Sequence, residues 1–286
     1  MEQKLFHLHA LSALHVGTGQ GVGVVDLPIA RARATNLPLV PGSAIKGVLR
    51  DELGAKLNET LTNTLFGPAS TADSAHAGAL AVGDAHLLLL PVRSYSGVVA
   101  FATCPFILQR YARDLAVSAP SLPPVGAETA ALPKDSALLA GDKVLLEDLD
   151  LKAMKGELGT EKWAELIADA LYPGKDADAW RKEFTKHFAI LPDGVFAFLA
   201  DTATEIRARV RIDDATRTVD DGALWYEENL PAESVLWGVI GVSRSRNKGH
   251  EATAPELAKQ LPCGEITLQI GGKHTVGRGL CRFLLA

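Results

Sequence analysis

Apolar and charged side chains alternate strictly over residues 204–212, which is the period of a β-strand with two different faces. One face carries Ile206, Ala208, Val210 and Ile212, and the other carries Arg207, Arg209 and Arg211. A polar segment, DDATRTVDDG, and then ALWYEENLP follow. This order predicts a β-hairpin with a long loop over about residues 201–228.

Other apolar stretches predict the strands of a larger sheet. Residues 3–16 alternate, with Leu5, His7, His9 and Leu11 on one face and Phe6, Leu8 and Ala10 on the other. A glycine-rich loop, GTGQGVGVVD, follows and ends at Asp26. Residues 79–92 and 97–103 favour buried strands, the first with a bulge at Gly83, and EITLQI favours a late strand.

Helical periodicity is found in three other places. After Pro41 and Gly42, Ser43 is a candidate cap, and apolar residues repeat at helical spacing at Ile45, Val48, Leu49 and Leu53. Residues 104–116 predict a helix opened by Pro105, and residues 157–188 carry further helical patterns. Residues 117–140 are rich in Pro, Ala and Ser and predict a mobile loop or surface excursion. We therefore interpret about 115–190 as a partly helical insertion in a β-rich frame.

Composition narrows the class of protein. The 286 residues are 47% hydrophobic, enough for a substantial core in one large domain or two intimate ones. The formal net charge is -5, so any nucleic-acid site must come from local clusters of Lys and Arg. The three cysteines lack CxxC spacing, which argues against a zinc site or a disulfide framework and suits a reducing cytosol. No signal peptide or membrane-spanning run is evident, so we expect a cytoplasmic protein with no membrane partner.

Three basic clusters are candidate phosphate sites. The row of Arg207, Arg209 and Arg211 suits regularly spaced phosphate contacts, but a solvated strand face is equally compatible. The segment GGKHTVGRG favours anion binding over a simple tight turn, since glycines let backbone amides approach a phosphate and Lys273, His274 and Arg278 add charge. Ser43, Lys46 and Arg50 line one helix, where an exposed amphipathic helix is the simpler interpretation.

Acidic residues and a histidine offer weaker chemical signals. Asp26 follows the glycine-rich loop and by itself reads as a turn-forming aspartate. His15 ends the first predicted strand as an edge histidine, and Glu227 with Glu228 fits a solvated strand end. The familiar hydrolase motifs GxSxG and HExxH are absent from the sequence, so it supports no standard hydrolase template.

Taken in order, several motifs resemble the RAMP superfamily (repeat-associated mysterious proteins) of CRISPR systems. These are LSALHVGTG, the loop with Asp26, LPLVPGSAIKGVLR, LFG at 65–67, GALAVGDAHLLLLPVRS and GGKHTVGRG. PVRSYSGVVAFATCPFILQRYARD and DGALWYEENLPAES are similar to the filament-forming backbone subunits of the type III-B effector, the Cmr complex.

The resemblance implies an α+β fold of a particular kind. We expect a ferredoxin-like, RRM-related palm over 1–115 and 191–286, with a thumb hairpin at about 201–228 and a partly helical insertion over 116–190. The resemblance is weakest through 117–190.

The resemblance also implies the partners of the chain. Copies are expected to stack head to tail along a guide CRISPR RNA, with other subunits of the type III-B complex, and to hold a target RNA. The guide-binding positions of the family are matched here by Ser43, Lys46, Arg50, Lys273 and Arg278. The same glycine loop holds His274, Gly277 and Gly279. The thumb, with its three arginines, is expected to press between bases and kink the duplex of guide and target.

Asp26 matches the aspartate implicated in cutting target RNA, and His15 and Glu227 match neighbours of that site. The implied activity is metal-dependent endoribonuclease cleavage by a 2′-OH, which leaves a cyclic phosphate and a 5′-OH. Asp26 either holds a divalent ion, Mg²⁺ or Mn²⁺, or acts as a base. The alternatives are a purely structural RNA-binding subunit and a nuclease that matures guide RNA; the hairpin and the type III-B motifs argue against the latter.

Overall fold

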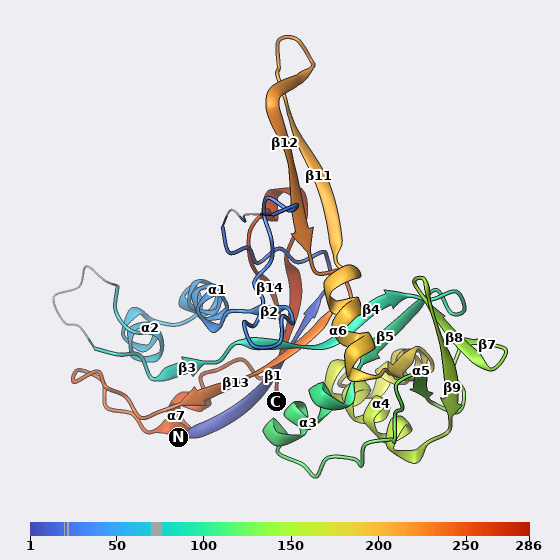
Figure 1. Cartoon of the computed structure of the whole chain (residues 1–286). Coiled ribbons are helices and arrows are strands. Elements are labelled where there is room, and N and C mark those ends of the chain that lie inside the picture. Colours follow the sequence, from blue (N-terminus) through green and yellow to red (C-terminus); the bar gives the residue numbers. More distant parts are fainter. Residues whose placement is uncertain (20, 22, 70–75) are drawn as a thin grey trace.

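Most strands of the chain join one large mixed sheet (Figure 1). The computed structural model describes residues 1–286 except 20, 22 and 70–75. Within these residues the sheet order is β14-β15-β1-β13-β4-β5-β10-β6-β9-β8-β7, with β2 paired to β4 and β3 to β13. The strands are β1 Glu2–Ala10, β2 Leu39–Val40, β3 Leu80–Val82, β4 Ala85–Arg93, β5 Val99–Thr103, β6 Thr129–Leu132, β7 Leu139–Ala140, β8 Lys143–Leu146, β9 Leu149–Lys155, β10 Phe188–Ile190, β13 Val235–Val242, β14 Gly264–Gln269 and β15 Leu280–Leu285.

Helices gather at the two ends of the sheet. In Figure 1, α1 and α2 lie at one end, and α3, α4 and α5 lie at the other. The helices are α1 Gly42–Gly54, α2 Glu59–Phe66, α3 Pro105–Asp114, α4 Leu158–Leu171, α5 Asp178–Lys186, α6 Asp193–Thr202 and α7 Ala254–Ala258, with short 3-10 turns η1 Lys175–Ala177 and η2 His274–Val276. The fold is therefore of the predicted α+β class.

The centre of the sheet is buried on both faces. β1 pairs with β13 and β15, and Phe6 and Leu8 on one of its faces are as deeply buried as His7 and His9 on the other. His7 contacts the hydroxyl group of Tyr111 on α3, at 2.7 Å from Nε2. Burial lowers the pKa of His7 to about 4, so the ring is neutral in the core at physiological pH.

A separate two-stranded hairpin projects from the body. It consists of β11 Glu205–Ile212 and β12 Val219–Asn229, as the alternation of residues 204–212 predicts. Figure 1 shows it standing away from the sheet, next to α6. Its apolar face stays open to solvent: Ile206 is 49% exposed and Val210 is 45% exposed. Among the described residues, the contacts of the hairpin with the body are found at its root, where Asp26 and Leu27 bond to β12.

Several predicted elements are confirmed, and others are corrected. Strand β5 and helix α3, opened by Pro105, lie where the sequence places them. The first strand, however, ends at Ala10 and not at residue 16. Ser43 does not cap α1: the N-cap is Pro41, without a side-chain hydrogen bond, and Ser43 is exposed.

The segment 117–140 is also corrected. β6 lies inside the sheet between β10 and β9, and its residues 130–132 are buried, so the predicted mobile loop is wrong over this stretch. α4 and α5 bear out the helical patterns of 157–188. The division into palm, thumb and insertion stays a prediction.

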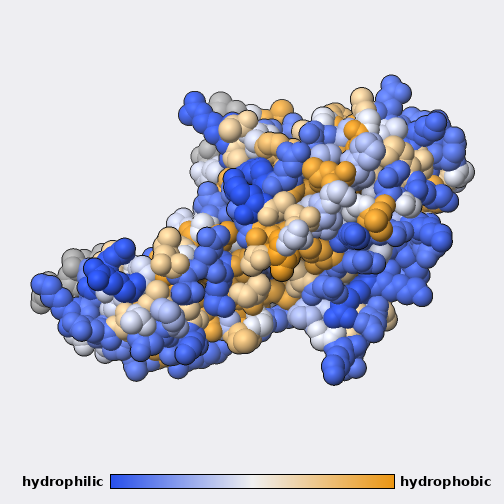
Figure 2. Space-filling model, turned by 90° about the horizontal axis from the view of Figure 1, so that it is seen from below, coloured by the Kyte–Doolittle hydropathy of each residue, from blue (hydrophilic) through white to orange (hydrophobic). Residues whose placement is uncertain are grey.

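The outer surface has two further features. Seen from the side opposite the hairpin, Figure 2 shows apolar residues in a band across the middle of the molecule, between more hydrophilic ends. In the described part of the chain, no helix is long and apolar enough to cross a membrane.

Candidate active site and nucleic-acid interface

Asp26 is fixed against the root of the hairpin. The backbone N–H of Tyr226 on β12 donates to Asp26 Oδ2 at 2.7 Å. Next to it, Leu27 N–H donates to the carbonyl of Tyr226 at 3.1 Å, and Glu228 N–H donates to the carbonyl of Leu27 at 3.0 Å. Asp26 is otherwise exposed. The carboxylate thus binds a partner 200 residues away along the chain instead of a turn of its own. Residues 20 and 22 of the preceding loop lie outside the described residues.

His15 lies at the same root, against the edge of β12 that also pairs with Leu27, and glycines surround it. It is buried, and Nδ1 lies 2.7 Å from the carbonyl oxygen of Glu228. Because a carbonyl only accepts, Nδ1 donates here and Nε2 is free to accept when the ring is neutral. A Cβ on Gly17 would lie 2.8 Å from His15 Nε2, and a Cβ on Gly271 would lie 2.3 Å from the carbonyl oxygen of His15. Glycine at these positions therefore leaves room for the imidazole and its backbone.

Glu227 is a fully buried carboxylate among cations. Its Oε1 accepts from Trp225 Nε1 at 2.8 Å and from Lys273 Nζ at 3.0 Å, and Arg209 Nε lies 4.0 Å away. Oε2 has no hydrogen-bond partner among the residues that the structure describes. Burial is the largest influence on the pKa of Glu227 and favours protonation. The hydrogen bonds and charges of these neighbours outweigh it and hold the pKa below its ordinary value.

The C-terminal glycine loop closes over this carboxylate. Lys273, in a left-handed conformation with φ 64°, lies 5.7 Å from the centre of the Trp225 ring as well as against Glu227. His274 and Gly277 are exposed. Arg278 is only 8% exposed, so its side chain is not the free surface donor that the sequence suggests. A Cβ on Gly279 would lie 2.0 Å from the carbonyl oxygen of Ile270, so this glycine is required by close backbone packing.

The arginine row shares a face of the hairpin with Glu227. In the strand register, Arg207 lies opposite Glu227 and Arg209 opposite Trp225. Arg207 forms an ion pair with Glu205 at 2.5 Å. Arg211 lies farther from the root, next to Ile212, whose partner on β12 is Val219. The row therefore runs from the buried carboxylate toward the free tip.

The basic stripe of α1 folds back onto backbone carbonyls. Lys46 Nζ donates to the carbonyl of Leu80 at 3.0 Å, and Arg50 donates to the carbonyl of Gly67 and to Asn63. Burial, and secondly the charge of Arg50, lowers the pKa of Lys46. α1 packs against β14, the strand that leads into the glycine loop. Among the described residues, no hydrogen bond or ion pair joins this stripe to the hairpin root. Asp26, His15 and Lys273 each bond to a residue of β12, so the structure gathers them with Glu227 at this root and leaves Ser43, Lys46 and Arg50 apart.

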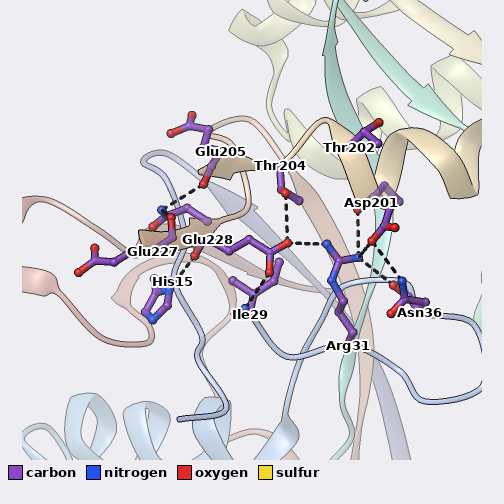
Figure 3. Close-up of polar contacts among 12 residues, drawn as sticks. His15, Ile29, Arg31, Asn36, Asp201, Thr202, Thr204, Glu205, Glu227 and Glu228 are labelled. Carbon is purple, nitrogen blue, oxygen red and sulfur yellow. Dashed lines mark hydrogen bonds and ion pairs between the residues drawn. The ribbon is translucent and has the colours of Figure 1, made fainter. Parts of the chain in front are cut away.

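Sequence patterns gave no sign of a buried ion pair at the same root. Arg31 Nη2 lies 2.5 Å from Glu228 Oε1, and the two side chains are 15% and 8% exposed (Figure 3). The interpretation of Glu227 and Glu228 as a solvated strand end is therefore wrong. The two partners are 197 residues apart, and no local periodicity connects them.

The side chains around Asp26 could hold a divalent ion only if a bound ligand supplied further oxygen atoms. Within the described part of the chain, no three His, Cys, Asp or Glu side chains gather into a metal-binding group. Asp26 offers an exposed carboxylate, with Oδ2 already accepting one N–H group. Mg²⁺ is commonly held by one or two carboxylates together with waters and phosphate oxygens, so a single exposed aspartate fits that pattern only where a ligand supplies phosphate oxygens beside it.

Several known proteins are similar to this chain over nearly its whole length. Residues 7–282 match the family model described as RAMP superfamily. The chain is 35% identical to the CRISPR system Cmr endoribonuclease Cmr4 of Pyrococcus furiosus over 293 residues, covering 100% of this chain and 96% of that protein. It is 23% identical to the CRISPR system CMR subunit Cmr4 of Saccharolobus solfataricus, covering 97% and 94%.

Solved structures share the fold. The oligomeric Cmr4 crystal structure from Pyrococcus furiosus superposes with a TM-score of 0.74 at 28% identity, covering 100% of this chain and 98% of that one. A chain of the type III-B Cmr-beta complex bound to cognate target RNA gives 0.72 at 17% identity, covering 100% and 97%, and supports the fold alone. The family match and the full-length similarity together show that this chain belongs to the RAMP superfamily and, within it, to the Cmr4 family.

Proposed function

We propose that this chain is the RNA-binding backbone subunit of a type III-B CRISPR effector complex and that it cleaves bound target RNA at Asp26. The observation that carries the proposal is the placement of Asp26. Its carboxylate is hydrogen-bonded to the hairpin root, next to His15 and Glu227, in a chain 35% identical to a Cmr endoribonuclease over its full length.

The projecting hairpin next to Asp26 could place a nucleotide of the RNA in a geometry that allows cleavage. In a regular A-form duplex the ribose 2′-OH is not aligned with the adjacent phosphorus. A hairpin inserted between bases displaces a nucleotide and frees its ribose to reach that alignment. Holding the reacting groups in line supplies a large share of the rate in such reactions. The exposed apolar side chains of β11, Ile206 and Val210, suit insertion between base steps, as apolar wedges of other nucleic-acid-binding proteins do.

Guide binding is assigned to two basic surfaces. Lys46 and Arg50 on α1, with Ser43 in its first turn, form one, and the glycine loop with Lys273, His274 and Gly277 forms the other. Arg207, Arg209 and Arg211 extend the positive charge along the hairpin. Arg278 and Gly279 contribute to this surface by shaping the loop, because both are buried.

Asp26 has two possible chemical roles in this proposal. As a ligand it holds a Mg²⁺ or Mn²⁺ ion, which when bound would stabilise negative charge on the phosphate; as a base it accepts the proton of the 2′-OH. In both, the Tyr226 N–H group orients the carboxylate, and the hairpin root fixes its distance from the RNA. The expected products are a 2′,3′-cyclic phosphate and a 5′-OH.

The partners proposed are guide RNA, target RNA, further copies of this chain and other subunits of the complex, in the cytoplasm. Self-association is supported by the 28% identity to a Cmr4 whose crystal structure is oligomeric. The apolar band of Figure 2 offers a surface on which another subunit can pack.

Replacement of Asp26 by Asn tests the proposal, because the amide retains the shape of the side chain and removes its charge. In the complex assembled with guide RNA and supplied with complementary target and Mg²⁺ or Mn²⁺, we expect D26N to lose cleavage while target binding persists. Undiminished cleavage at regular intervals would refute the catalytic assignment. A wild-type complex that assembles and binds both RNAs but does not cut the target would leave a structural subunit as the function.

A further inference from the structure

The ion pair between Arg31 and Glu228 joins the Asp26 segment to the hairpin at a buried point (Figure 3). Glu228 uses both carboxylate oxygens. Oε1 accepts from Arg31 Nη2 at 2.5 Å and from the Thr204 hydroxyl group at 3.1 Å, and Oε2 accepts from the backbone N–H of Ile29 at 3.0 Å. The Glu228 side chain, near the end of β12, therefore bonds both to Thr204, just before β11, and to Ile29, three residues after Asp26.

The guanidinium of Arg31 extends the same network to α6. Its Nη1 donates to the carbonyl of Ala200 at 3.1 Å and to the carbonyl of Asn36 at 2.8 Å. Asp201 Oδ1 lies 3.6 Å from Nη1 and also accepts from Asn36 Nδ2 at 3.2 Å. The carbonyls at the C-terminal end of a helix carry partial negative charge, so a cation is favoured there. A planar fork can serve all these acceptors at once, whereas an ammonium group cannot.

Asp26 and Glu228 hold the two ends of one short stretch of parallel pairing. At one end Asp26 Oδ2 accepts from Tyr226 N–H, and at the other Glu228 Oε2 accepts from Ile29 N–H. Between them Leu27 exchanges backbone hydrogen bonds with Tyr226 and Glu228. The backbone carbonyl of Glu228 also accepts the hydrogen bond from His15 Nδ1. Displacement of Glu228 would therefore shift Asp26 and His15 relative to the hairpin.

From this geometry we propose that Arg31 and Glu228 are positioning residues that hold Asp26 in register with the hairpin. They act through the Asp26 segment and need no contact with RNA. Buried ion pairs often contribute little net stability compared with an apolar replacement, and one role they can serve is to select a single arrangement of the chain. The proposal rests on the proposed function of Asp26 and adds the residues that place it.

Arg31→Lys is the main test, because lysine keeps the charge and loses the fork; Glu228→Gln is the second variant. Both are assembled with guide RNA, and the single-turnover cleavage rate at saturating target, the affinity for target and the positions of the cuts are measured. Arg93→Lys is the matched control, since Arg93 pairs with Glu147 at 3.3 Å and its side chain is 71% exposed.

We expect Arg31→Lys to lower the rate roughly 10- to 100-fold, as small misplacements of catalytic groups do. Cuts should spread to neighbouring phosphates, while target affinity and the native mass of the complex stay unchanged. Rates within about twofold of wild type with unchanged cut positions would overturn the proposal. Loss of assembly in both variants would also overturn it, since the pair would then be needed for the fold.

Asp26→Ala, measured in parallel, separates this proposal from the one on which it rests. Cleavage that persists in Asp26→Ala refutes the proposed function itself. Cleavage that is lost in Asp26→Ala but kept at wild-type rate and positions in Arg31→Lys refutes only the positioning role.

Discussion

Glu227 keeps a negative charge inside the protein because its neighbours compensate for the lost hydration. Trp225, Lys273 and Arg209 surround Oε1, and the side chain is fully buried. A buried carboxylate without such partners would be neutral at physiological pH. The carboxylate in turn holds Lys273, so the glycine loop is positioned by charge as well as by backbone hydrogen bonds.

Glu227→Gln should destabilise the protein by about 1–3 kcal/mol at pH 7, because the hydrogen bonds to Trp225 and Lys273 lose their charge. The pKa of Glu227 is lowered by folding, so this stabilisation is complete above the ordinary value of 4.5 and disappears as pH falls through the lowered pKa. Thermal unfolding of both proteins from neutral to acidic pH checks this.

The difference in Tm between wild type and Glu227→Gln should therefore shrink in acid. Glu147→Gln, which alters the exposed pair with Arg93, is the control and should change Tm little at any pH. An equal Tm difference at all pH values would contradict the electrostatic account of this site.

Gly17 tests the packing around His15. Ala at this position places a Cβ 2.8 Å from His15 Nε2, so the ring or the loop must move. We expect a loss of about 1–3 kcal/mol in stability, typical of overpacking, and a lower rate of RNA cleavage. Gly194→Ala on α6 is the control: among the described residues nothing lies within 4 Å of its added Cβ. A Gly17→Ala protein that matches the control in both Tm and rate would argue against a role for His15.

At the scale of elements, the hairpin β11–β12 depends on its root. An isolated two-stranded hairpin is at best marginally stable in water. This one leaves Val210 and Leu224 about half exposed, at 45% and 54%. Its support comes from the Asp26 segment, from Glu227 with Lys273, and from Glu228 with Arg31. The contacts that position the candidate catalytic residue are thus the same contacts that support the hairpin.

Reversal of charge at Arg207, Arg209 and Arg211 to Glu should weaken binding of target RNA by the assembled complex. The slope of log affinity against log salt is negative, and each lost phosphate contact should make it less steep by about 0.7 for single strands. Fluorescence anisotropy over a range of salt concentrations measures this slope.

The matched control for the arginine row replaces three exposed lysines of α4, η1 and α5 by Glu. These are Lys162, Lys175 and Lys182. Because the change in net charge is equal, this control separates local phosphate contacts from the overall field. If both triple variants alter affinity and slope alike, the arginine row has no specific contact with RNA.

Elements with a strong local period could be predicted from sequence, and those defined by distant pairing could not. The alternation of residues 204–212 and the helical spacing after Pro41 act within a few residues, and both appear as β11 and α1. Burial of Glu228 depends on Arg31, 197 residues away. β6 was missed because its sheet partners, β10 and β9, lie later in the chain and are needed to complete it.

At the scale of the whole molecule, a net charge of -5 coexists with local positive surfaces. These surfaces are on different elements: the hairpin arginines, the basic stripe of α1, and Lys273. Ion pairs with Glu205 and Glu227 compensate part of their charge. A single copy therefore offers few free phosphate contacts. Stacked copies along one guide RNA would add such contacts, so we expect RNA binding and cleavage in the assembled complex and not in the isolated chain.

Single-turnover cleavage by the assembled complex carrying Asp26→Ala decides whether Asp26 is catalytic, with target binding and native mass measured on the same sample. We expect the wild-type complex to cut the target at regular intervals. We expect the Asp26→Ala complex to have the same mass, to bind the target equally well and not to cut it. Cleavage by Asp26→Ala at the wild-type positions and rate would contradict a catalytic role for Asp26.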